Sequence, residues 1–168
     1  MRSIQLLGLS LFATACATNA AKAPPRSDPT TPVAATSSST AGEEIVARTN
    51  VERLKRGLPE LPPNASLMRA AHIHATQMAA QRKMAHDLPG TQYPTMATRL
   101  AAVGYRMMAS GENVAEGYPT PSAVVAGWMT SAAHRDNITS TRFTEMGAAV
   151  ATGSNGRLYY AQVFARPR

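Results

Sequence analysis

The sequence predicts an α+β domain in which helices are layered against a small sheet. Apolar residues recur at helical spacing in several stretches between residues 43 and 131, and two apolar, strand-like runs follow, separated by a glycine-containing turn. A chain of 168 residues accommodates one such domain with residues to spare. Helices followed by a late hairpin favour an αβα layered arrangement.

The first two helices are predicted from their apolar faces and their ends. One covers residues 43–56, ends at Gly57, and turns Asn50 and Arg53 toward the same side as its apolar residues. The next follows Asn64, a plausible N-cap, and runs to about residue 85. Its apolar stripe includes His74, which is therefore expected to face the core.

Two further helices and a hairpin complete the domain. The third helix covers roughly residues 94–103, and the fourth begins with Thr120 as N-cap and ends near residue 131. Residues 107–117 have no amphipathic period and are expected to form a loop or a short strand. The runs 143–151 and 158–165, joined by a Gly-Ser-Asn-Gly turn, predict a β-hairpin.

Residues 1–19 have the features of an export signal. Arg2 precedes an apolar stretch from Ile4 to Ala15 that is too short to span a bilayer comfortably. Cys16 follows small residues, as the lipid-modified cysteine of a bacterial lipoprotein does, and this interpretation is favoured. The alternative is ordinary cleavage after Ala15, Ala17 or Ala20, with no special role for Cys16.

The segment 20–42 consists almost wholly of Ala, Pro, Ser and Thr, so it is expected to be a disordered linker. The remaining residues, 43–168, are then expected to form one domain and to behave as a monomer. Attachment of the protein to a membrane would come from a lipid anchor on Cys16.

Composition excludes several classes of protein. A single Cys excludes a disulfide scaffold and a multi-Cys zinc site, leaving room for an open site built on the four His and on carboxylates. The net charge of +7 is spread along the chain among Glu and Asp. Because no basic run stands out, no binding to nucleic acid is expected.

The domain resembles the CAP superfamily, also called the SCP domain, which comprises cysteine-rich secretory, antigen 5 and pathogenesis-related proteins. Seven pieces match in order and spacing: Asn50-x-x-Arg53 with Gly57, Ala71-x-x-His74, Ala85-His86, Gly111-Glu112-Asn113, Trp128-x-x-Ser131-x-x-His134-x-x-Asn137, Phe143-Thr144-Glu145-Met146-Gly147, and Gln162-Val163-Phe164. The chain looks like a bacterial member of this superfamily.

The resemblance implies an αβα sandwich with a three-stranded antiparallel sheet between helices, and a central cavity lined by histidines and acids. Matched position by position, the cavity residues are His86, His134 and Glu112. Eukaryotic members carry a second acid where this chain has Ser131. Glu145 is expected to substitute for it from the strand side, on its placement alone.

Two interpretations of these polar residues are open. His86, His134, Glu112 and Glu145 suit zinc or another divalent metal, and the same groups suit general acid and base chemistry. Alternatively, the histidines and Glu112 form a hydrogen-bonded network that ties loops to the sheet. For the remaining buried polar residues a structural role is expected: Asn50, Arg53, His74, Asn113 and Asn137.

Two functions follow from the resemblance. The favoured one is a non-enzymatic, exported protein of the cell envelope that binds a lipid, a wall polymer or a protein through the central cleft. The other is a metal-dependent, peptidase-like hydrolase that uses His86, His134 and Glu112. A plainly secreted or periplasmic protein is the alternative to the anchored one.

Overall fold

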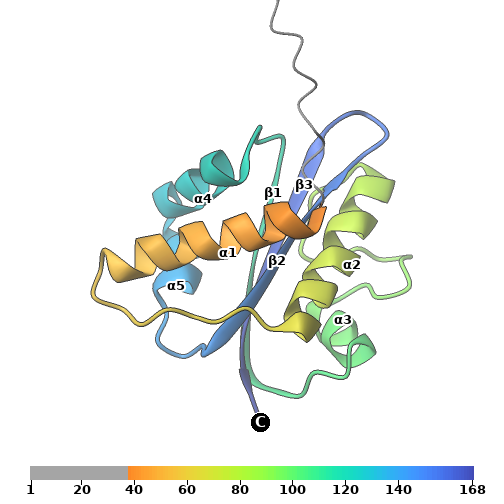
Figure 1. Cartoon of the computed structure of the whole chain (residues 1–168). Coiled ribbons are helices and arrows are strands. Elements are labelled where there is room, and N and C mark those ends of the chain that lie inside the picture. The colour runs from red at the N-terminus through yellow and green to blue at the C-terminus, as the bar shows by residue number, and fades with distance from the viewer. Residues whose placement is uncertain (1–37) are drawn as a thin grey trace, which may run out of the picture. The chain divides into compact units, whose positions relative to one another are not determined.

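The computed structural model describes residues 38–168, so the expected export signal with Cys16 and most of the expected linker lie outside the described residues. Within these residues the helices are α1 (Ser38–Leu54), α2 (Ala65–Gln81), α3 (Met96–Ala102), α4 (Pro121–Thr130) and α5 (Ala132–Thr139). The strands are β1 (Met107–Glu116), β2 (Glu145–Thr152) and β3 (Leu158–Pro167) (Figure 1).

The three strands form one antiparallel sheet in the order β1-β3-β2, so β3 is central and β1 and β2 are edges. Helices cover both faces of this sheet, with α1, α4 and α5 on one side and α2 and α3 on the other (Figure 1). The predicted αβα sandwich with a three-stranded antiparallel sheet is therefore confirmed.

Alternation along β3 divides the core into two apolar clusters. Tyr160 and Phe164 pack with α1, α4 and α5, whereas Tyr159, Ala161 and Val163 pack with α2 and α3. Both faces of β3 are buried because each is covered by helices. Among residues 38–168, no helix is long and apolar enough to cross a membrane.

Helix boundaries differ from the expected ones for identifiable reasons. Helix α1 begins at Ser38, inside the segment expected to be linker, because Ala41 and Gly42 are buried against the domain. A Cβ on Gly42 would lie 2.3 Å from the carbonyl oxygen of Ala148, so the helix packs directly on β2. Helix α2 ends at Gln81, earlier than expected, because Arg82 adopts a left-handed conformation with φ of 52°.

Two elements are not evident in the sequence pattern. The stretch left open as a loop or short strand is the ten-residue strand β1, whose residues 113–115 are all buried and therefore show no alternation. Residues 132–139, for which the sequence predicts no element, form α5, a polar helix of eight residues without a side-chain cap. Both elements carry residues of the candidate site.

Candidate functional site

Glu112 of β1 is the centre of a buried polar cluster. Its side chain is 4% exposed, and hydrogen bonds reach it from three elements. His74 of α2 lies 2.8 Å from Oε2 through Nδ1, and Arg99 of α3 donates to the same oxygen from 3.0 Å. His86, on the loop between α2 and α3, lies 2.9 Å from Oε1 through its Nδ1. Three bonds to one carboxylate leave it little free capacity.

The second contact of His74 fixes the position of its ring. Its Nε2 lies 2.9 Å from the carbonyl oxygen of Ala85, on the loop that follows α2. Both ring nitrogens of the fully buried His74 therefore have an oxygen partner, one on Glu112 and one on this loop.

These partners keep Glu112 ionised despite its burial. Burial alone would raise the pKa of the carboxyl group. The hydrogen bonds from His74 and His86, together with the charges of His74 and Arg99, outweigh burial and lower the pKa of Glu112 to about 2. The carboxylate is therefore a fixed negative charge at neutral pH rather than a base that exchanges protons.

Arg99 is not predicted from the sequence, although it is 1% exposed and makes a direct contact with Glu112. Its Nη2 also donates to the carbonyl oxygen of His86, 3.0 Å away, so one guanidinium joins the acid and the histidine-bearing loop. Helix α3 has only seven residues, too few for a periodic pattern to show which side chains face inward. A chemical argument could have indicated such a residue, because a buried carboxylate requires a buried cation.

His86 lies on the loop between α2 and α3, and His134 lies on α5, which packs on the opposite face of the sheet from α2 and α3. The side chain of His86 is 59% exposed, and its Nε2 has no hydrogen-bond partner in the described part of the chain. His134 lies on α5, and neither of its ring nitrogens has a partner among residues 38–168. The hydrogen bond to Glu112 raises the pKa of His86, whereas burial and then the nearby His86 lower the pKa of His134.

These opposite shifts give a measurable order of titration. In a two-dimensional NMR titration of ring resonances, His86 is expected to titrate above the ordinary pKa of about 6.5 and His134 below it. In a Glu112→Gln variant, which lacks the charge on the acceptor, the pKa of His86 should fall. Coincident titration of His86 and His134 would contradict the assignment.

Asn113 and Asn137 hold α5 against β1. The Nδ2 of Asn137 donates to the carbonyl oxygen of Glu112 at 3.1 Å and to Oδ1 of Asn113 at 3.0 Å. The Nδ2 of Asn113 donates to the carbonyl oxygen of His134 and to Oε1 of Gln162. The amides therefore fix the backbone that carries His134 relative to the backbone that carries Glu112.

Asn50 and Arg53 make their bonds away from this cluster. Asn50 exchanges two hydrogen bonds with the backbone of Leu61, and Arg53 donates to the carbonyl oxygens of Pro59, Ile138 and Ser140. They join α1 to the following loop and to the end of α5.

Glu145, expected as an additional acid of the cavity, has other partners. It lies at the start of β2 and accepts hydrogen bonds from the hydroxyl group of Tyr105 and from Nδ2 of Asn64, the N-cap of α2. None of its hydrogen bonds goes to His86, His134 or Glu112. The structure thus joins His86 to Glu112, places His134 near enough to His86 to feel its charge, and gives Glu145 a role in joining α2 to the sheet.

An apolar groove begins at His134 and follows the edge of β1. Its volume is about 330 Å³, within the range of small-molecule sites. Trp128 forms part of its wall and donates from Nε1 to the carbonyl oxygen of Val114, which fixes the indole ring against the strand. The other lining residues are Met84, Ala115, Glu116, Tyr118, Gly127, Thr130 and Ser131.

The donor atoms fit only part of a zinc site. His86 Nε2 and the ring of His134 are available, and the bond from Glu112 to Nδ1 orients His86 as a metal-binding histidine is commonly oriented. Catalytic zinc sites use three protein ligands, however, and Glu112 is already engaged by three donors. No group of three or more His, Cys, Asp or Glu within residues 38–168 is arranged to hold a metal ion.

Comparison with known proteins places the chain in a family. Residues 46–164 match the model of the cysteine-rich secretory protein family, CAP. The uncharacterized protein YkwD of Bacillus subtilis (strain 168) is 36% identical over 138 residues, which are 80% of this chain and 53% of the relative. The chain therefore spans about half the length of this relative.

Two solved structures have the same fold. An extracellular protein of Bacillus anthracis str. Ames that contains an SCP domain superposes with a TM-score of 0.69 at 28% identity, over 75% of this chain and 40% of that one. An outer surface protein of Borrelia burgdorferi gives 0.67 at 20% identity, over 75% and 92%, and shows the fold alone. The family match and the shared architecture agree that the chain belongs to the cysteine-rich secretory protein (CAP) family.

Proposed function

We propose that the chain is an exported CAP-domain protein of the cell envelope that binds a ligand in the cleft at the edge of β1. One observation carries this proposal: His134, whose ring nitrogens have no partner among residues 38–168, lines an apolar groove of about 330 Å³. The arrangement suits an elongated ligand with an apolar part in the groove and a hydrogen-bonding group at His134. A lipid, a wall polymer and a protein segment are the candidate ligands.

Export and membrane attachment rest on the N-terminal sequence. The pattern of residues 1–19 is that of an export signal, and the structural relative from Bacillus anthracis is described as extracellular. Anchoring would use a lipid on Cys16. Replacing Cys16 with Ser should abolish lipid labelling and release the protein from the membrane fraction, whereas a plainly cleaved protein would be soluble before and after the change.

Trp128 is the only tryptophan of the chain, so its fluorescence reports directly on occupancy of the groove. With anilinonaphthalene sulfonate, an apolar anion, we expect saturable binding that changes Trp128 emission. Thr130→Phe, which puts a ring over the exposed rim, should weaken binding at least about tenfold by filling the groove. His134→Ala should weaken it several-fold by removing the hydrogen-bonding end.

The matched control is Ser122→Phe, which introduces the same aromatic ring on the same helix at a residue outside the groove. Its affinity should equal that of the unchanged protein. Equal dye binding by the Thr130→Phe and Ser122→Phe proteins would contradict the proposed cleft.

The metal-dependent hydrolase remains the second candidate because Glu112 orients His86 as a metal-ligand histidine. Chelator-treated protein titrated with zinc separates the two functions. The hydrolase predicts stoichiometric zinc binding and peptide turnover, both lost in His134→Ala. Ligand binding without metal, and no turnover with zinc, supports the binding protein.

A further inference from the structure

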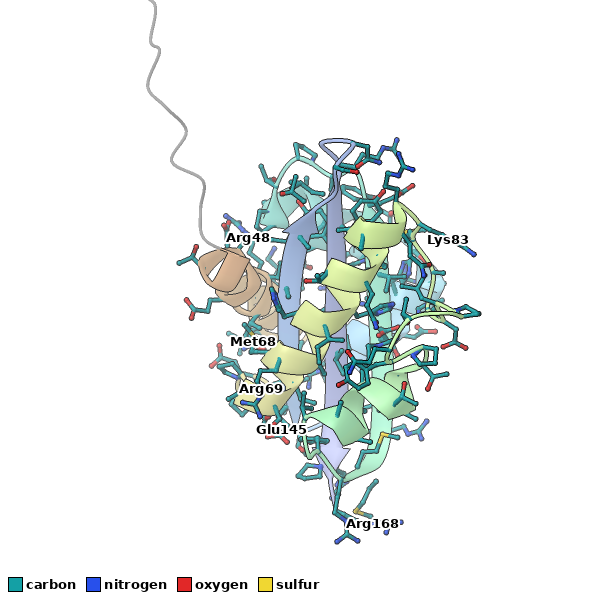
Figure 2. All side chains as sticks on the ribbon, turned by 90° about the vertical axis from the view of Figure 1, so that its right-hand side faces the viewer. Arg48, Met68, Arg69, Lys83, Glu145 and Arg168 are labelled. Atoms are coloured by element: carbon teal, nitrogen blue, oxygen red, sulfur yellow. The ribbon has the colours of Figure 1, made fainter. Side chains whose placement is uncertain are left out.

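Four arginines gather where one end of the sheet leaves the domain. Arg106 directly precedes β1, and Arg166 and Arg168 lie at the end of β3. Arg168 N–H donates to the carbonyl oxygen of Arg106 at 3.0 Å, and Arg166 pairs with Ala109. Arg142 leads into β2, whose first residue pairs with Ala165. We call Arg106, Arg142, Arg166 and Arg168 the basic end of the sheet. Arg168 is labelled at the bottom of Figure 2.

The arginines of the basic end have no ion-pair partner in the described part of the chain. All four arginines are exposed, and in the described part of the chain none of their side chains makes an ion pair or a hydrogen bond. Three arginines elsewhere on the surface differ, since Arg48, Arg56 and Arg157 each pair with a glutamate. Glu145, which starts β2 at this end, accepts hydrogen bonds from Tyr105 and Asn64 and makes no ion pair with these arginines.

An apolar side chain projects among these charges. The register of β1 against β3 shifts between Met107 and Ala109, and the intervening Met108 is 68% exposed. It is the most exposed of the large apolar side chains in the described residues. A bulge at the end of an edge strand thus presents a flexible apolar group beside unpaired guanidinium groups.

We propose that the basic end binds the surface of an anionic lipid bilayer, with the arginines at lipid phosphates and Met108 in the interface. Charge complementarity carries the choice of partner, since planar guanidinium groups bind phosphates well and basic clusters are attracted to anionic headgroups. The exposed Met108 favours a bilayer over a soluble polyanion, because only the bilayer has an apolar layer beneath its charge. This contact is independent of the cleft beside His134.

Vesicle sedimentation tests whether the charges of the basic end are needed for binding. The full chain is mixed with vesicles of phosphatidylglycerol and phosphatidylcholine, or of phosphatidylcholine alone. Replacing all four arginines of the basic end with Gln should weaken binding to the anionic vesicles at least about tenfold, and about 0.5 M salt should have a similar effect. Every variant keeps the same N-terminal segment, so differences between variants report on the basic end.

The matched control removes the same charge elsewhere, with Arg48, Arg82, Lys83 and Arg157 changed to Gln. Arg48 and Lys83 lie away from Arg168 in Figure 2, and Arg157 lies in the turn between β2 and β3, at the other end of the sheet. This protein should retain most of its affinity. Equal losses in the two quadruple variants would overturn the proposal, because binding would then follow net charge alone.

A second measurement tests insertion. In a Cys16→Ser background, Met108→Cys and Leu54→Cys are labelled with an environment-sensitive dye; Leu54, on α1, is 55% exposed. Anionic vesicles should shift the emission of the dye at residue 108 to the blue and leave residue 54 unchanged. Binding to soluble polyphosphate without any vesicle-induced shift at residue 108 would assign the basic end to a polyanion and overturn the membrane proposal.

Discussion

Replacing Glu112 with Leu is expected to reduce the free energy of unfolding by about 3 to 5 kcal/mol. The substitution leaves Arg99 and His74 buried without their acceptor, and their side chains are 1% and 0% exposed. Glu112→Gln keeps the shape and one acceptor oxygen, so it should have a smaller effect. Denaturant unfolding followed by circular dichroism measures both.

The control lies on the same strand. Glu116→Gln removes an ion pair with Arg157 whose side chains are 29% and 56% exposed, and such pairs contribute at most about 1 kcal/mol. A Glu112→Leu protein as stable as the Glu116→Gln protein would show that the buried cluster is not what holds α2, α3 and β1 together.

The same carboxylate should make stability depend on acid. Its pKa in the folded protein is about 2, below the ordinary value of 4.5, so the unfolded chain takes up the proton first. The stabilisation is complete above pH 4.5 and is lost as the pH falls toward 2, by roughly 3 kcal/mol in total. Glu112→Gln should remove this part of the pH dependence, and an unchanged acid profile in that variant would contradict the assignment.

The sequence predicted those features that short-range patterns and motif order encode. The hairpin, the inward face of His74 and the layered fold followed from periodicity, and the resemblance brought His86, His134 and Glu112 to one cleft. The structure adds the relation between them: Glu112 binds His74, His86 and Arg99 at once. These contacts join β1, α2, α3 and the loop between the two helices, and their partners are up to 38 residues apart in the sequence. Such contacts are not visible in the periodicity of the sequence.

The basic end of the sheet shows the same limit. Along the chain its arginines are spaced between residues 106 and 168, so the sequence shows them as scattered charges. Antiparallel order places the start of β1, the start of β2 and the end of β3 at one end of the sheet, so the four charges converge. Strand register, rather than composition, determines whether positive charge is dispersed or concentrated.

Gly147→Ala is expected to destabilise the domain by about 3 kcal/mol, although the change adds one methyl group. A Cβ at this position of β2 would lie 2.2 Å from the carbonyl carbon of Leu67 and 2.3 Å from the backbone nitrogen of Met68. Both are backbone atoms of α2, so no side-chain rotation relieves the overlap and the helix itself must move. Thr152→Val, at the exposed end of the same strand, is the control and should change stability by less than about 0.5 kcal/mol.

A movement of α2 should also affect Glu112, because α2 carries His74 two turns beyond the contact with Gly147. If α2 moves outward, the 2.8 Å contact between His74 and Glu112 lengthens and the pKa of Glu112 rises toward its ordinary value. The Gly147→Ala protein should then lose less stability between pH 4.5 and 2 than the unchanged protein does. If the protein loses stability but keeps the full acid dependence, α2 tilts while His74 stays in place. If its stability is unreduced, α2 and β2 do not pack closely enough to put a Cβ of residue 147 at 2.2 Å from the carbonyl carbon of Leu67.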